Sequence, residues 1–557
     1  MSETNKFIKE QTQRLEATID NCAKQSHDRQ SLLLVSGDMS GIQPFLYQIV
    51  SSKAAKNLKG RSCYIDLLGK AVVRSLLKAL SLTEDYVICE SGGTFVLVAP
   101  NIPDITNKLD NAIRLIEKKI FETHGTALSV SIDSVEITSQ EAKGGTATLA
   151  QRWNEVFAKR ELKKNAKCSS RMLDDDGYRV FFQPSRVSGN KTDAVTGEDI
   201  ADVDSAVVKD FDDSSKDLVV SKVNKTLIEL GECLRDGGIP KPVEDNYKGN
   251  DFVIEPAGLG IKFRLVNDGD ATEVKTFEKM CENADEDALE RLGVLRMDVD
   301  NLGSKFQEYA RTQSLVAYSA LSRELDEFFK KDVYKLCCQE ECYLLYGGGD
   351  DLFVVGEWRN VIKLATNIQD KFKQWAKVRN GDWSLSGGVA IVKAKYPIIE
   401  GAKESGEEED NAKNHNCDGL TKNSISLMGT PLNWDKEFEP VIKLKDRVVQ
   451  LLSNKEKEVL PKSFLNKVMM HASKASIKSH KVTDVSIYWQ LTYDIKRALE
   501  RAKNNEDVKD LLDCCRKDIC TPGDTLAGEK IVTNYHLLEL WALACRWAEL
   551  EYRSNKE

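Results

Sequence analysis

One order of predicted elements occurs twice in this chain of 557 residues. Apolar runs, helical spacing and glycine turns place the first copy as a strand at 31–38, a helix at 53–80, a hairpin at 87–98, a helix at 104–122 and a strand at 127–133. The second copy has a strand at 293–300, a helix at 314–336, a hairpin at 342–355, a helix at 358–379 and a strand at 383–392. This β-α-β-β-α-β order is ferredoxin-like. The repeat therefore predicts the α+β class, with two versions of one domain.

The rest of the chain is arranged around these two copies. Its predicted domains are an N-terminal helical extension (1–30), a first, degenerate ferredoxin-like domain (31–140), a small linker domain (141–285), a second ferredoxin-like domain with the G-G-D-D motif (286–435) and a C-terminal helical bundle (436–557). The linker segment is poorly patterned and carries acidic clusters, whereas the last segment has apolar residues at helical spacing.

Composition excludes several classes of protein. The net charge is −9, so a nucleic-acid surface has to be a local patch. No run approaches the ~20 apolar residues of a membrane span, and the first residues lack the apolar segment of a signal peptide, so a cytoplasmic protein without membrane contact is expected. The 14 cysteines show no C-x-x-C spacing, which predicts reduced thiols, no disulfides and no zinc.

Aspartates distinguish the second copy from the first. When the hairpins are aligned on their apolar residues, Asp350 and Asp351 stand opposite Gly93 and Thr94. The preceding strands likewise set Asp298 and Asp300 opposite Asp38 and Ser40. Because the first strand and the hairpin are neighbours in a ferredoxin-like sheet, the four aspartates of the second copy are expected to converge at one edge.

Converging carboxylates repel one another and remain ionised when cations neutralise them, so Asp298, Asp300, Asp350 and Asp351 are the predicted metal ligands, for Mg²⁺ or Mn²⁺. Two such ions can activate a hydroxyl and stabilise a pyrophosphate leaving group. The glycines at 347–349 permit a tight turn that a nucleotide can approach, and the backbone after Asp300 can offer N–H groups to a triphosphate. The alternative is that G-G-D-D is an ordinary surface turn.

Five motifs carry a resemblance to a known family. They are Gly37-Asp-Met-Ser-Gly-Ile-Gln43, Gly60-Arg-Ser62, Ser91-Gly-Gly93, Met297-Asp-Val-Asp-Asn-Leu-Gly303 and Gly348-Gly-Asp-Asp351. In this order they resemble the signatures of the large palm-domain subunit of type III CRISPR effector complexes, of the Csm type. The resemblance extends from about residue 31 to the C-terminal bundle.

The resemblance implies an ATP-dependent oligoadenylate cyclase. Two palms would face each other with two ATP molecules between them, and a cyclic oligoadenylate would form when guide CRISPR RNA pairs with target RNA. The catalytic residues would be Asp350 and Asp351, and other Csm-type subunits would be partners. The implied nucleotide-binding residues are Gly37, Asp38, Ser40, Gly41, Gly92, Gly93, Asn301, Leu302, Gly303, Gly348 and Gly349.

Two departures from the family pattern are predicted. The family commonly has an N-terminal HD nuclease domain, whereas only about 30 residues precede the first predicted strand here, and His27-Asp28 is interpreted as a surface pair, so no DNA cleavage is expected. The family often has zinc-binding cysteines in the linker, whereas this chain has Thr192-Asp193-Ala-Val-Thr196-Gly197 at a plausible position. No zinc is expected.

RNA binding is predicted for a basic run in the last segment. Between Lys443 and Lys481 there are ten Lys or Arg residues and three Asp or Glu residues. The candidate RNA contacts are Lys462, Lys467, Lys474, Lys478 and Lys481, with a solvated helix face as the alternative. Two alternatives to the cyclase also remain at this point, namely a catalytically silent scaffold of the same complex and a polymerase or cyclase that makes a different adenylate product.

Overall fold

The computed structural model describes most of the chain. The described residues are 3–27, 31–49, 54–144, 147–174, 177–182, 191–200, 204–209, 216–243, 249, 251–267, 277–281, 289–312, 314–349, 351–379, 382–453, 460–475, 477–478, 481–482, 486–502, 505–520 and 523–552. Asp28 and Asp350 lie outside them, as do the side chains of Lys478 and Lys481.

The first repeat forms a four-stranded antiparallel sheet. Its elements are β1 (Ser31–Ser40), α2 (Ile42–Tyr47), α3 (Ala54–Leu80), η1 (Glu84–Tyr86), β2 (Val87–Ser91), β3 (Thr94–Pro100), α4 (Ile105–His124) and β4 (Ser129–Thr138). The strand order is β2-β3-β1-β4, so β1 lies between the hairpin and the last strand. This places the end of β1 beside the turn of the β2–β3 hairpin.

The second repeat has the same strand order. Its elements are β12 (Leu292–Val299), α11 (Leu302–Thr312), α12 (Leu315–Glu327), the π-helical turn η4 (Phe328–Val333), α13 (Tyr334–Gln339), β13 (Tyr343–Gly348), β14 (Asp351–Glu357), α14 (Trp358–Lys377) and β15 (Leu385–Val392). The order β13-β14-β12-β15 is extended by β18 (Ser424–Leu427) and β19 (Thr430–Asn433). The mixed α+β class is thus confirmed. Helix α11 was not predicted from the sequence.

A further helix covers one face of each sheet. After β4, α5 (Ser139–Lys143) is followed by α6 (Ala147–Asn165), which packs on β4 and β1; after β15, α15 (Ile398–Asn414) packs on β15 and β12. Helix α6 lies in the segment predicted as linker, but it packs on the first sheet and against α11 of the second repeat. The structural repeat therefore continues one helix beyond the fourth strand.

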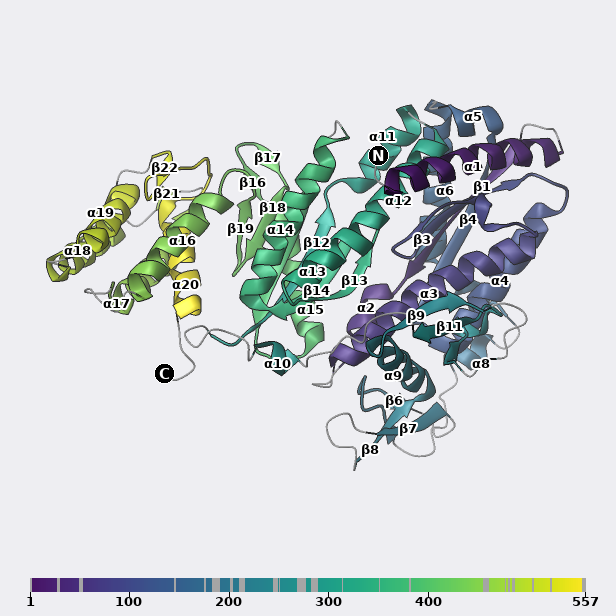
Figure 1. Ribbon diagram of the computed structural model, residues 1–557, viewed down its shortest axis with the longest axis horizontal. Coiled ribbons are helices and arrows are strands. Elements are labelled where there is room, and N and C mark those ends of the chain that lie inside the picture. Colours follow the sequence, from purple (N-terminus) through teal and green to yellow (C-terminus); the bar gives the residue numbers. More distant parts are fainter. Residues whose placement is uncertain are drawn as a thin grey trace.

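The two repeats share their hydrophobic cores. Helix α12 of the second repeat packs with α1 (Glu3–Gln25) and α6 over the first sheet, where Tyr318 contacts the Trp153 ring at 4.4 Å between centroids. On another side, the Tyr47 ring of α2 lies 4.5 Å from the Phe353 ring of β14. Figure 1 shows the two sheets side by side in an elongated molecule.

Asp193 organises the segment between the repeats. This segment contains α7 (Ser169–Met172), α8 (Gly177–Phe182), β5 (Lys191–Thr192), β6 (Asp199–Ile200), β7 (Ser205–Lys209), β8 (Asp217–Ser221), α9 (Lys222–Arg235), β9 (Gly238–Pro242), β10 (Val253–Ile254), η3 (Pro256–Gly258), β11 (Phe263–Asn267) and α10 (Phe277–Cys281). The Asp193 carboxylate accepts hydrogen bonds from the amides of Val195 (2.8 Å) and Ser221 (2.6 Å) and from Asn224 Nδ2 (2.7 Å). Burial raises its pKa, but these bonds lower it overall. They hold the turn at 192–197, where the related family often has zinc-binding cysteines.

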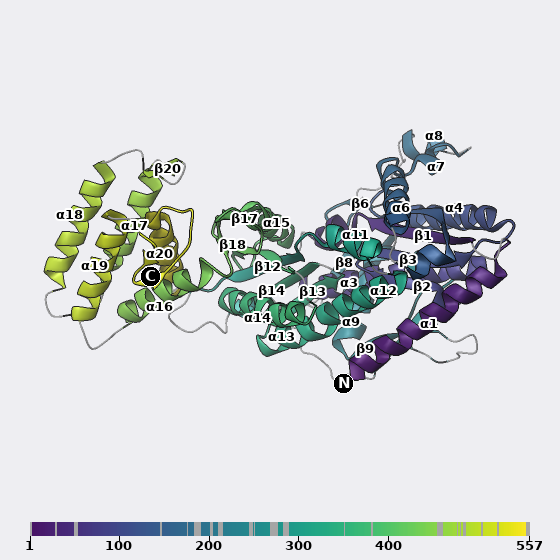
Figure 2. The same cartoon turned by 90° about the horizontal axis from the view of Figure 1, so that it is seen from above.

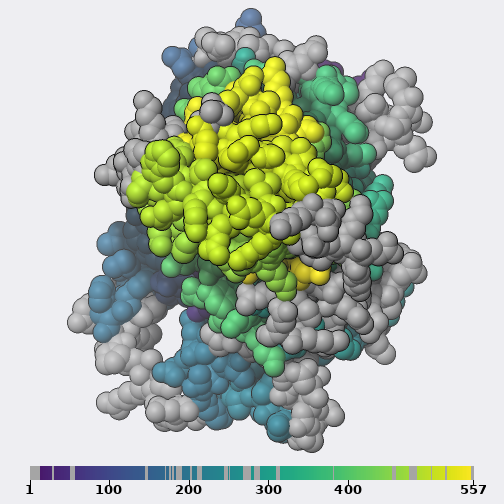
Figure 3. All heavy atoms as spheres, turned by 90° about the vertical axis from the view of Figure 1, so that its left-hand side faces the viewer, coloured from purple at the N-terminus to yellow at the C-terminus, as the bar shows by residue number. Residues whose placement is uncertain are grey.

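Helices form the C-terminal end of the molecule. They are α16 (Phe438–Ser453), α17 (Lys462–Lys474), α18 (Ser486–Arg501), α19 (Glu506–Cys520) and α20 (Leu537–Tyr552), with the short hairpins β20–β21 (Ile477–Lys478, Lys481–Val482) and β22–β23 (Thr525–Leu526, Glu529–Lys530). Helix α20 packs on α16 and α17 and carries Trp541 in the core. Figure 2 shows this unit at the opposite end of the molecule from the first repeat, and Figure 3 looks directly onto it.

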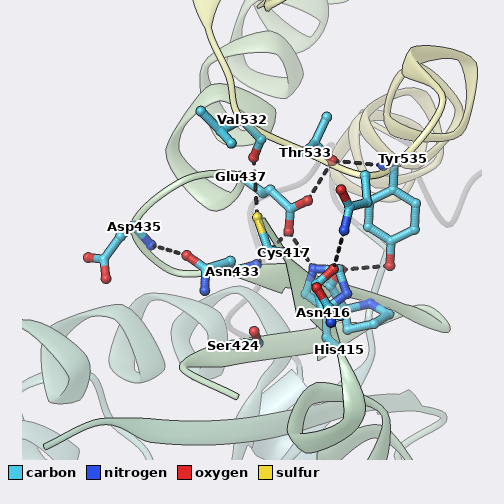
Figure 4. Close-up of polar contacts among 12 residues, drawn as sticks. His415, Asn416, Cys417, Ser424, Asn433, Asp435, Glu437, Val532, Thr533 and Tyr535 are labelled. Atoms are coloured by element: carbon cyan, nitrogen blue, oxygen red, sulfur yellow. Dashed lines mark hydrogen bonds and ion pairs between the residues drawn. The ribbon is translucent and has the colours of Figure 1, made fainter. Parts of the chain in front are cut away.

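A buried polar junction joins this end to the second sheet (Figure 4). Glu437 is fully buried, and its carboxylate contacts His415 Nε2 (2.6 Å), the Asn433 amide (2.8 Å) and Thr533 Oγ1 (2.5 Å). The His415 ring stacks on Tyr535, with 5.3 Å between centroids. Because a buried carboxylate is tolerated only with such partners, this junction fixes the bundle against the β16–β17 hairpin (Asn416–Cys417, Leu420–Thr421) and β19.

All 14 cysteines have free thiols. Within the described residues, no helix has the length and apolar character required to cross a membrane.

Candidate functional site

The strand register pairs two of the predicted aspartates. Asp298, near the end of β12, is directly opposite Asp351, the first residue of β14. Side chains at directly opposed antiparallel positions lie on one face of the sheet, about 5 Å apart at their Cβ atoms. Like charges at this separation destabilise the sheet unless a cation neutralises them.

A lysine supplies a positive charge at this pair. Lys413 Nζ of α15 lies 2.6 Å from Asp298 Oδ2 and 2.6 Å from Glu409 Oε1. Burial lowers the pKa of Lys413, but the two carboxylates raise it overall, so this lysine is a firmly held cation. Burial raises the pKa of Asp298, and Lys413 opposes that effect. Lys413 therefore keeps Asp298 more acidic than burial alone would.

The pH dependence of activity should respond to Lys413. In Lys413→Met, Asp298 loses its positive neighbour, its pKa rises further, and the carboxylate form, in which Asp298 would bind a metal ion, appears only at higher pH. We expect the acid limb of the pH–rate profile to move up by about one unit. Lys403→Met, an exposed position on the same helix, is the control and should leave the profile unchanged. An unshifted acid limb in Lys413→Met would contradict this role for Lys413.

Asp300 is buried and only half satisfied. It is 2% exposed, and its Oδ2 accepts hydrogen bonds from Ser384 Oγ (2.7 Å) and the Asn423 amide (3.0 Å). Its Oδ1 is buried and has no hydrogen-bond partner among the described residues. The next residue, Asn301, adopts φ = +58°, and its side-chain oxygen accepts from Lys422 Nζ (2.6 Å).

These residues have the donor chemistry of a magnesium or manganese site. Carboxylate oxygens are the ligands that these hard cations prefer, and the unpartnered Oδ1 of Asp300 is an oxygen that a cation would satisfy. Within the described part of the chain, no three His, Cys, Asp or Glu side chains gather in a metal-binding arrangement. Asp350, the fourth predicted ligand, is outside that part.

The first repeat has a related arrangement without the second carboxylate. Asp38 is directly opposite Thr94, whose Oγ1 donates a 2.7 Å hydrogen bond to Asp38 Oδ1. Lys164 Nζ of α6 lies 3.1 Å from Asp38 Oδ2, as Lys413 of α15 does beside Asp298. The shared register supports the alignment of Thr94 with Asp351. The Oγ atom of Ser40, aligned with Asp300, is also buried without a hydrogen-bond partner in the described structure.

The turns of the two hairpins touch. A Cβ at Gly348 would lie 3.0 Å from Gly92 Cα, so a side chain at this position would have to displace the other backbone. The Gly349 amide donates a 2.8 Å hydrogen bond to Ser91 Oγ. Gly349 adopts φ = +51°, which favours glycine. Two motifs about 260 residues apart thus meet at one point.

Cavity A, of about 300 Å³, lies on one side of this contact. It combines Gly92 of the first repeat with Leu302, Gly303 and Gly349 of the second. Its other lining residues are Cys89, Ser91, Thr94, Trp153, Phe157, Arg160, Phe306, Gln307, Tyr318, Ser322 and Leu325. Aromatic rings and a few polar groups in a space of this size suit a flat, partly polar ligand.

Arg160 gives cavity A a buried positive charge. Its side chain is 8% exposed, its Nη1 donates to Ser36 Oγ (3.1 Å), and its guanidinium lies 4.3 Å from the centre of the Phe157 ring. The Nε atom is buried without a hydrogen-bond partner in the described part of the chain. A buried guanidinium that keeps an unused donor favours an anionic or oxygen-rich ligand.

Cavity B, of about 330 Å³, lies on the other side of the two turns. It contains Gly92, Gly93 and Gly348 together with charged residues of α3, β2, α12 and η4. These charged residues are Asp66, Lys70, Glu90, Asp326 and Lys330. The two cavities thus share the hairpin turns but differ in chemistry, since cavity A is largely aromatic and cavity B is charged.

Glu90 should make stability depend on pH. Burial raises its pKa from 4.5 to about 7, with Asp66 adding to the effect. Because the folded protein binds this proton more tightly than the unfolded chain, the free energy of unfolding falls as pH rises from 4.5 to 7, by up to about 3 kcal/mol. Glu90→Gln should unfold at a higher temperature than wild type at pH 8 and at a similar one at pH 4.5. Glu122→Gln, at an exposed site, should match wild type in both scans; equal melting of Glu90→Gln and wild type at pH 8 would refute this.

Several of the predicted nucleotide-binding residues line neither cavity. Gly37 makes room for the Phe95 ring, since a Cβ there would lie 2.1 Å from it. A Cβ at Gly41 would lie 1.9 Å from the Ala127 carbonyl oxygen. Asp38, Ser40 and Asn301 also lie outside both linings. Gly303 differs, because a Cβ there meets nothing within 4 Å.

The basic run near the C-terminus is partly neutralised. Lys467 Nζ forms an ion pair with Asp494, which also contacts His471 Nε2 at 3.0 Å. Lys462 lies 5.5 Å from the centre of the Tyr552 ring, and Lys474 is exposed. Acidic residues from other elements therefore reduce the local excess of charge that the sequence indicates.

Comparisons with known proteins agree with this geometry. Residues 31–175 match the model of Csm1 subunit domain B, and residues 291–426 match that of the second palm domain of Cas10/Cmr2. The single-strand-specific deoxyribonuclease Cas10/Csm1 of the subtype III-A CRISPR system from Enterococcus italicus is 29% identical over 491 residues, covering 80% of this chain and 60% of that protein. The Streptococcus thermophilus protein of the same name is 26% identical over 423 residues, 72% of this chain and 54% of the relative.

The chain belongs to the Cas10/Csm1 family. It spans little more than half the length of these two Cas10/Csm1 relatives. A solved apo Csm1–Csm4 cassette has the same fold, with a TM-score of 0.65 and 18% identity, over 94% of this chain and 71% of that one. The Cas10 palm match ends at 426, so it includes α15 and Lys413.

Sequence reasoning did not identify Lys413, Arg160, Trp153 or Asp326. Lys413 had a detectable signal, since each repeat places a lysine, Lys164 or Lys413, on the helix after its fourth strand. Arg160 and Trp153 gave no signal in the sequence, because helical spacing cannot show that α6 borders a cavity formed with the other repeat. Asp326 likewise looks like any charged residue on an amphipathic helix.

Proposed function

We propose that the chain is the large subunit of an RNA-guided type III-A complex and converts ATP to cyclic oligoadenylate when target RNA is bound. The observation that carries this proposal is the pairing of Asp298 with Asp351 beside a turn that also borders cavity A. The family match to a Cas10 palm domain supports it.

The proposed catalytic centre is made of aspartates. Asp350 and Asp351 would be the catalytic pair, and together with Asp298 and Asp300 they would hold Mg²⁺ or Mn²⁺. When bound, these ions supply an activated ribose hydroxyl and neutralise charge at the α-phosphate and the leaving pyrophosphate. Lys413 holds Asp298 in its charged form, and the Asn423 amide and Ser384 hydroxyl fix one oxygen of Asp300.

The two cavities are the proposed nucleotide pockets. In cavity A, the rings of Trp153, Phe157 and Tyr318 would receive an adenine, with Gly303 leaving room for it. In cavity B, Lys70 and Lys330 would face phosphates or hydroxyls. Both cavities touch the same pair of turns, so two nucleotides would meet near Asp351, as the joining of a 3′-hydroxyl to an α-phosphate requires.

Solved proteins of this fold support ATP as the substrate class. Csm1–Csm4 cassettes with one ATP and with cA4 have TM-scores of 0.61 and 0.62 against this chain, each at 18% identity. By analogy, we propose a Csm4-type subunit as a partner, along with guide CRISPR RNA and target RNA. Lys462, Lys474, Lys478 and Lys481 remain proposed RNA contacts, whereas Lys467 is engaged with Asp494.

A silent scaffold is the second candidate function. The observation in its favour is Lys413, which already places a cation beside Asp298 where a metal ion would be expected. A scaffold would not need the unpartnered oxygen of Asp300 or an aromatic cavity between the repeats. Those two features favour the enzyme.

The deciding experiment is mass spectrometry of the products formed from ATP by the assembled complex. Wild-type complex with Mg²⁺ or Mn²⁺ and target RNA should yield cyclic oligoadenylates, and omission of target RNA or addition of EDTA should remove them. A linear or non-cyclic adenylate would replace the cyclase with another nucleotidyltransferase. If no product forms with all components present, the catalytically silent scaffold is the function that remains.

A further inference from the structure

The contact between the two hairpin turns contains a directed chain of hydrogen bonds. The Gly349 amide donates to Ser91 Oγ at 2.8 Å, and the Ser91 hydroxyl in turn donates to Asp326 Oδ1. A serine hydroxyl has one proton to give, and here it gives it to a carboxylate. Donation to a charged acceptor strengthens the bond that the same oxygen accepts from Gly349.

Asp326 is held in place from its own helix. Lys330 Nζ lies 2.9 Å from Asp326 Oδ1, and Lys330 belongs to the π-helical turn η4 that follows α12. Lys330 Nζ is also 3.8 Å from Asp66 of α3, which pairs with Lys70 at 2.6 Å. Burial lowers the pKa of Lys330, but Asp326 and Asp66 raise it overall, so the lysine remains charged.

This chain of contacts crosses between the repeats twice. Asp326 and Gly349 belong to the second repeat, whereas Ser91, which joins them, ends strand β2 of the first. Gly349 is two residues before Asp351, adopts φ = +51° and has no side chain of its own. The Gly349 amide donates to Ser91 Oγ, so a group of the first repeat fixes this turn.

We infer that Ser91 and Asp326 are positioning residues that hold the Gly348–Gly349 turn, and with it Asp351, in the geometry for nucleotidyl transfer. This inference rests on the proposed function. It also makes the activity of the second palm depend on how the first repeat sits against it, because a small separation of the two turns breaks the hydrogen bond to Gly349. The degenerate first repeat thereby acts on the aspartates without contributing a carboxylate to them.

Four variants of the full complex test this inference. Ser91→Ala removes the acceptor of the Gly349 amide, and Asp326→Asn removes the charge that orients the hydroxyl. Ser91→Thr keeps the hydroxyl and is the conservative rescue. Glu327→Gln is the matched control, because Glu327 forms the same i,i+4 lysine pair one residue further along, with Lys331 at 2.5 Å, and neither residue of that pair lines cavity A or cavity B.

The kinetic result should separate positioning from binding. For Ser91→Ala we expect kcat to fall about 10- to 100-fold, as for loss of a charge-assisted hydrogen bond, with a smaller rise in KM for ATP, because Ser91 also lines cavity A. Asp326→Asn should show a smaller loss of the same kind, Ser91→Thr should recover most of kcat, and Glu327→Gln should match wild type. A wild-type kcat in Ser91→Ala, or an equal loss in Glu327→Gln, would overturn the inference.

Hydrogen exchange provides a readout that does not need product. Backbone amides of the β13–β14 hairpin should exchange about tenfold faster in Ser91→Ala than in wild type or Glu327→Gln. Unchanged exchange overturns the positioning contact whatever the activity. If exchange responds as expected but wild-type complex makes no oligoadenylate, the contact is supported and the proposed function is the part that fails.

Discussion

Asp351→Asn should lower oligoadenylate formation by the assembled complex about 10³-fold. Asp351 and Asp298 are directly opposed on β14 and β12, and we assign both to the metal site. Asparagine keeps the size of the side chain but removes the charge that a divalent ion requires. The loss should appear in kcat at saturating ATP and Mg²⁺, measured as product per complex by mass spectrometry.

The same substitution should not weaken the fold. Removing one of two opposed carboxylates relieves repulsion across the strands, so the melting temperature of Asp351→Asn should equal or exceed that of wild type. Asp370→Asn, at an exposed position on α14, is the matched control and should retain full activity. Near-normal product from a folded Asp351→Asn complex would remove Asp351 from the catalytic centre.

The internal repeat made it possible to predict the fold from the sequence. Strand runs such as 293–300 and hairpins with glycine turns at 91–94 and 347–350 carry period-two patterns and turn residues that are local signals. The structure has both sheets with the same strand order. Helix α11 (Leu302–Thr312) was not predicted. It directly follows Asn301, whose positive φ separates the helix from the strand, and this turn cannot be recognised from the sequence.

The candidate site could be predicted from the sequence only in part. The pairing of Asp298 with Asp351 follows from register, which alignment of the repeats could supply. The cavities do not follow from register, because they are formed by side chains from both repeats and depend on how the two sheets are packed. Gly37 and Gly41 illustrate this limit, since their glycines are required by Phe95 and Ala127 rather than by a ligand cavity. A glycine motif in the sequence therefore does not indicate whether a ligand, a side chain or another backbone segment packs against it.

Gly303 is the position at which cavity A can be closed without disturbing the backbone. It lies in the first turn of α11, its φ is not in the left-handed region, and a Cβ there meets no atom within 4 Å. Gly303→Phe should therefore fold and place a ring in the space proposed for adenine. We expect ATP affinity and product formation to fall about 10- to 100-fold, as for loss of stacking of one base.

Gly303→Ala separates occupancy of the cavity from the effect on the helix. Both substitutions replace glycine by a residue with a higher helix propensity, so both should preserve or raise the melting temperature by removing the backbone freedom of glycine. Alanine adds only a Cβ and should leave ATP binding, measured by calorimetric titration of the complex, within about threefold of wild type. If Gly303→Phe binds ATP as tightly as Gly303→Ala does, adenine does not occupy cavity A, and the pocket has to be sought on the charged side of the two turns.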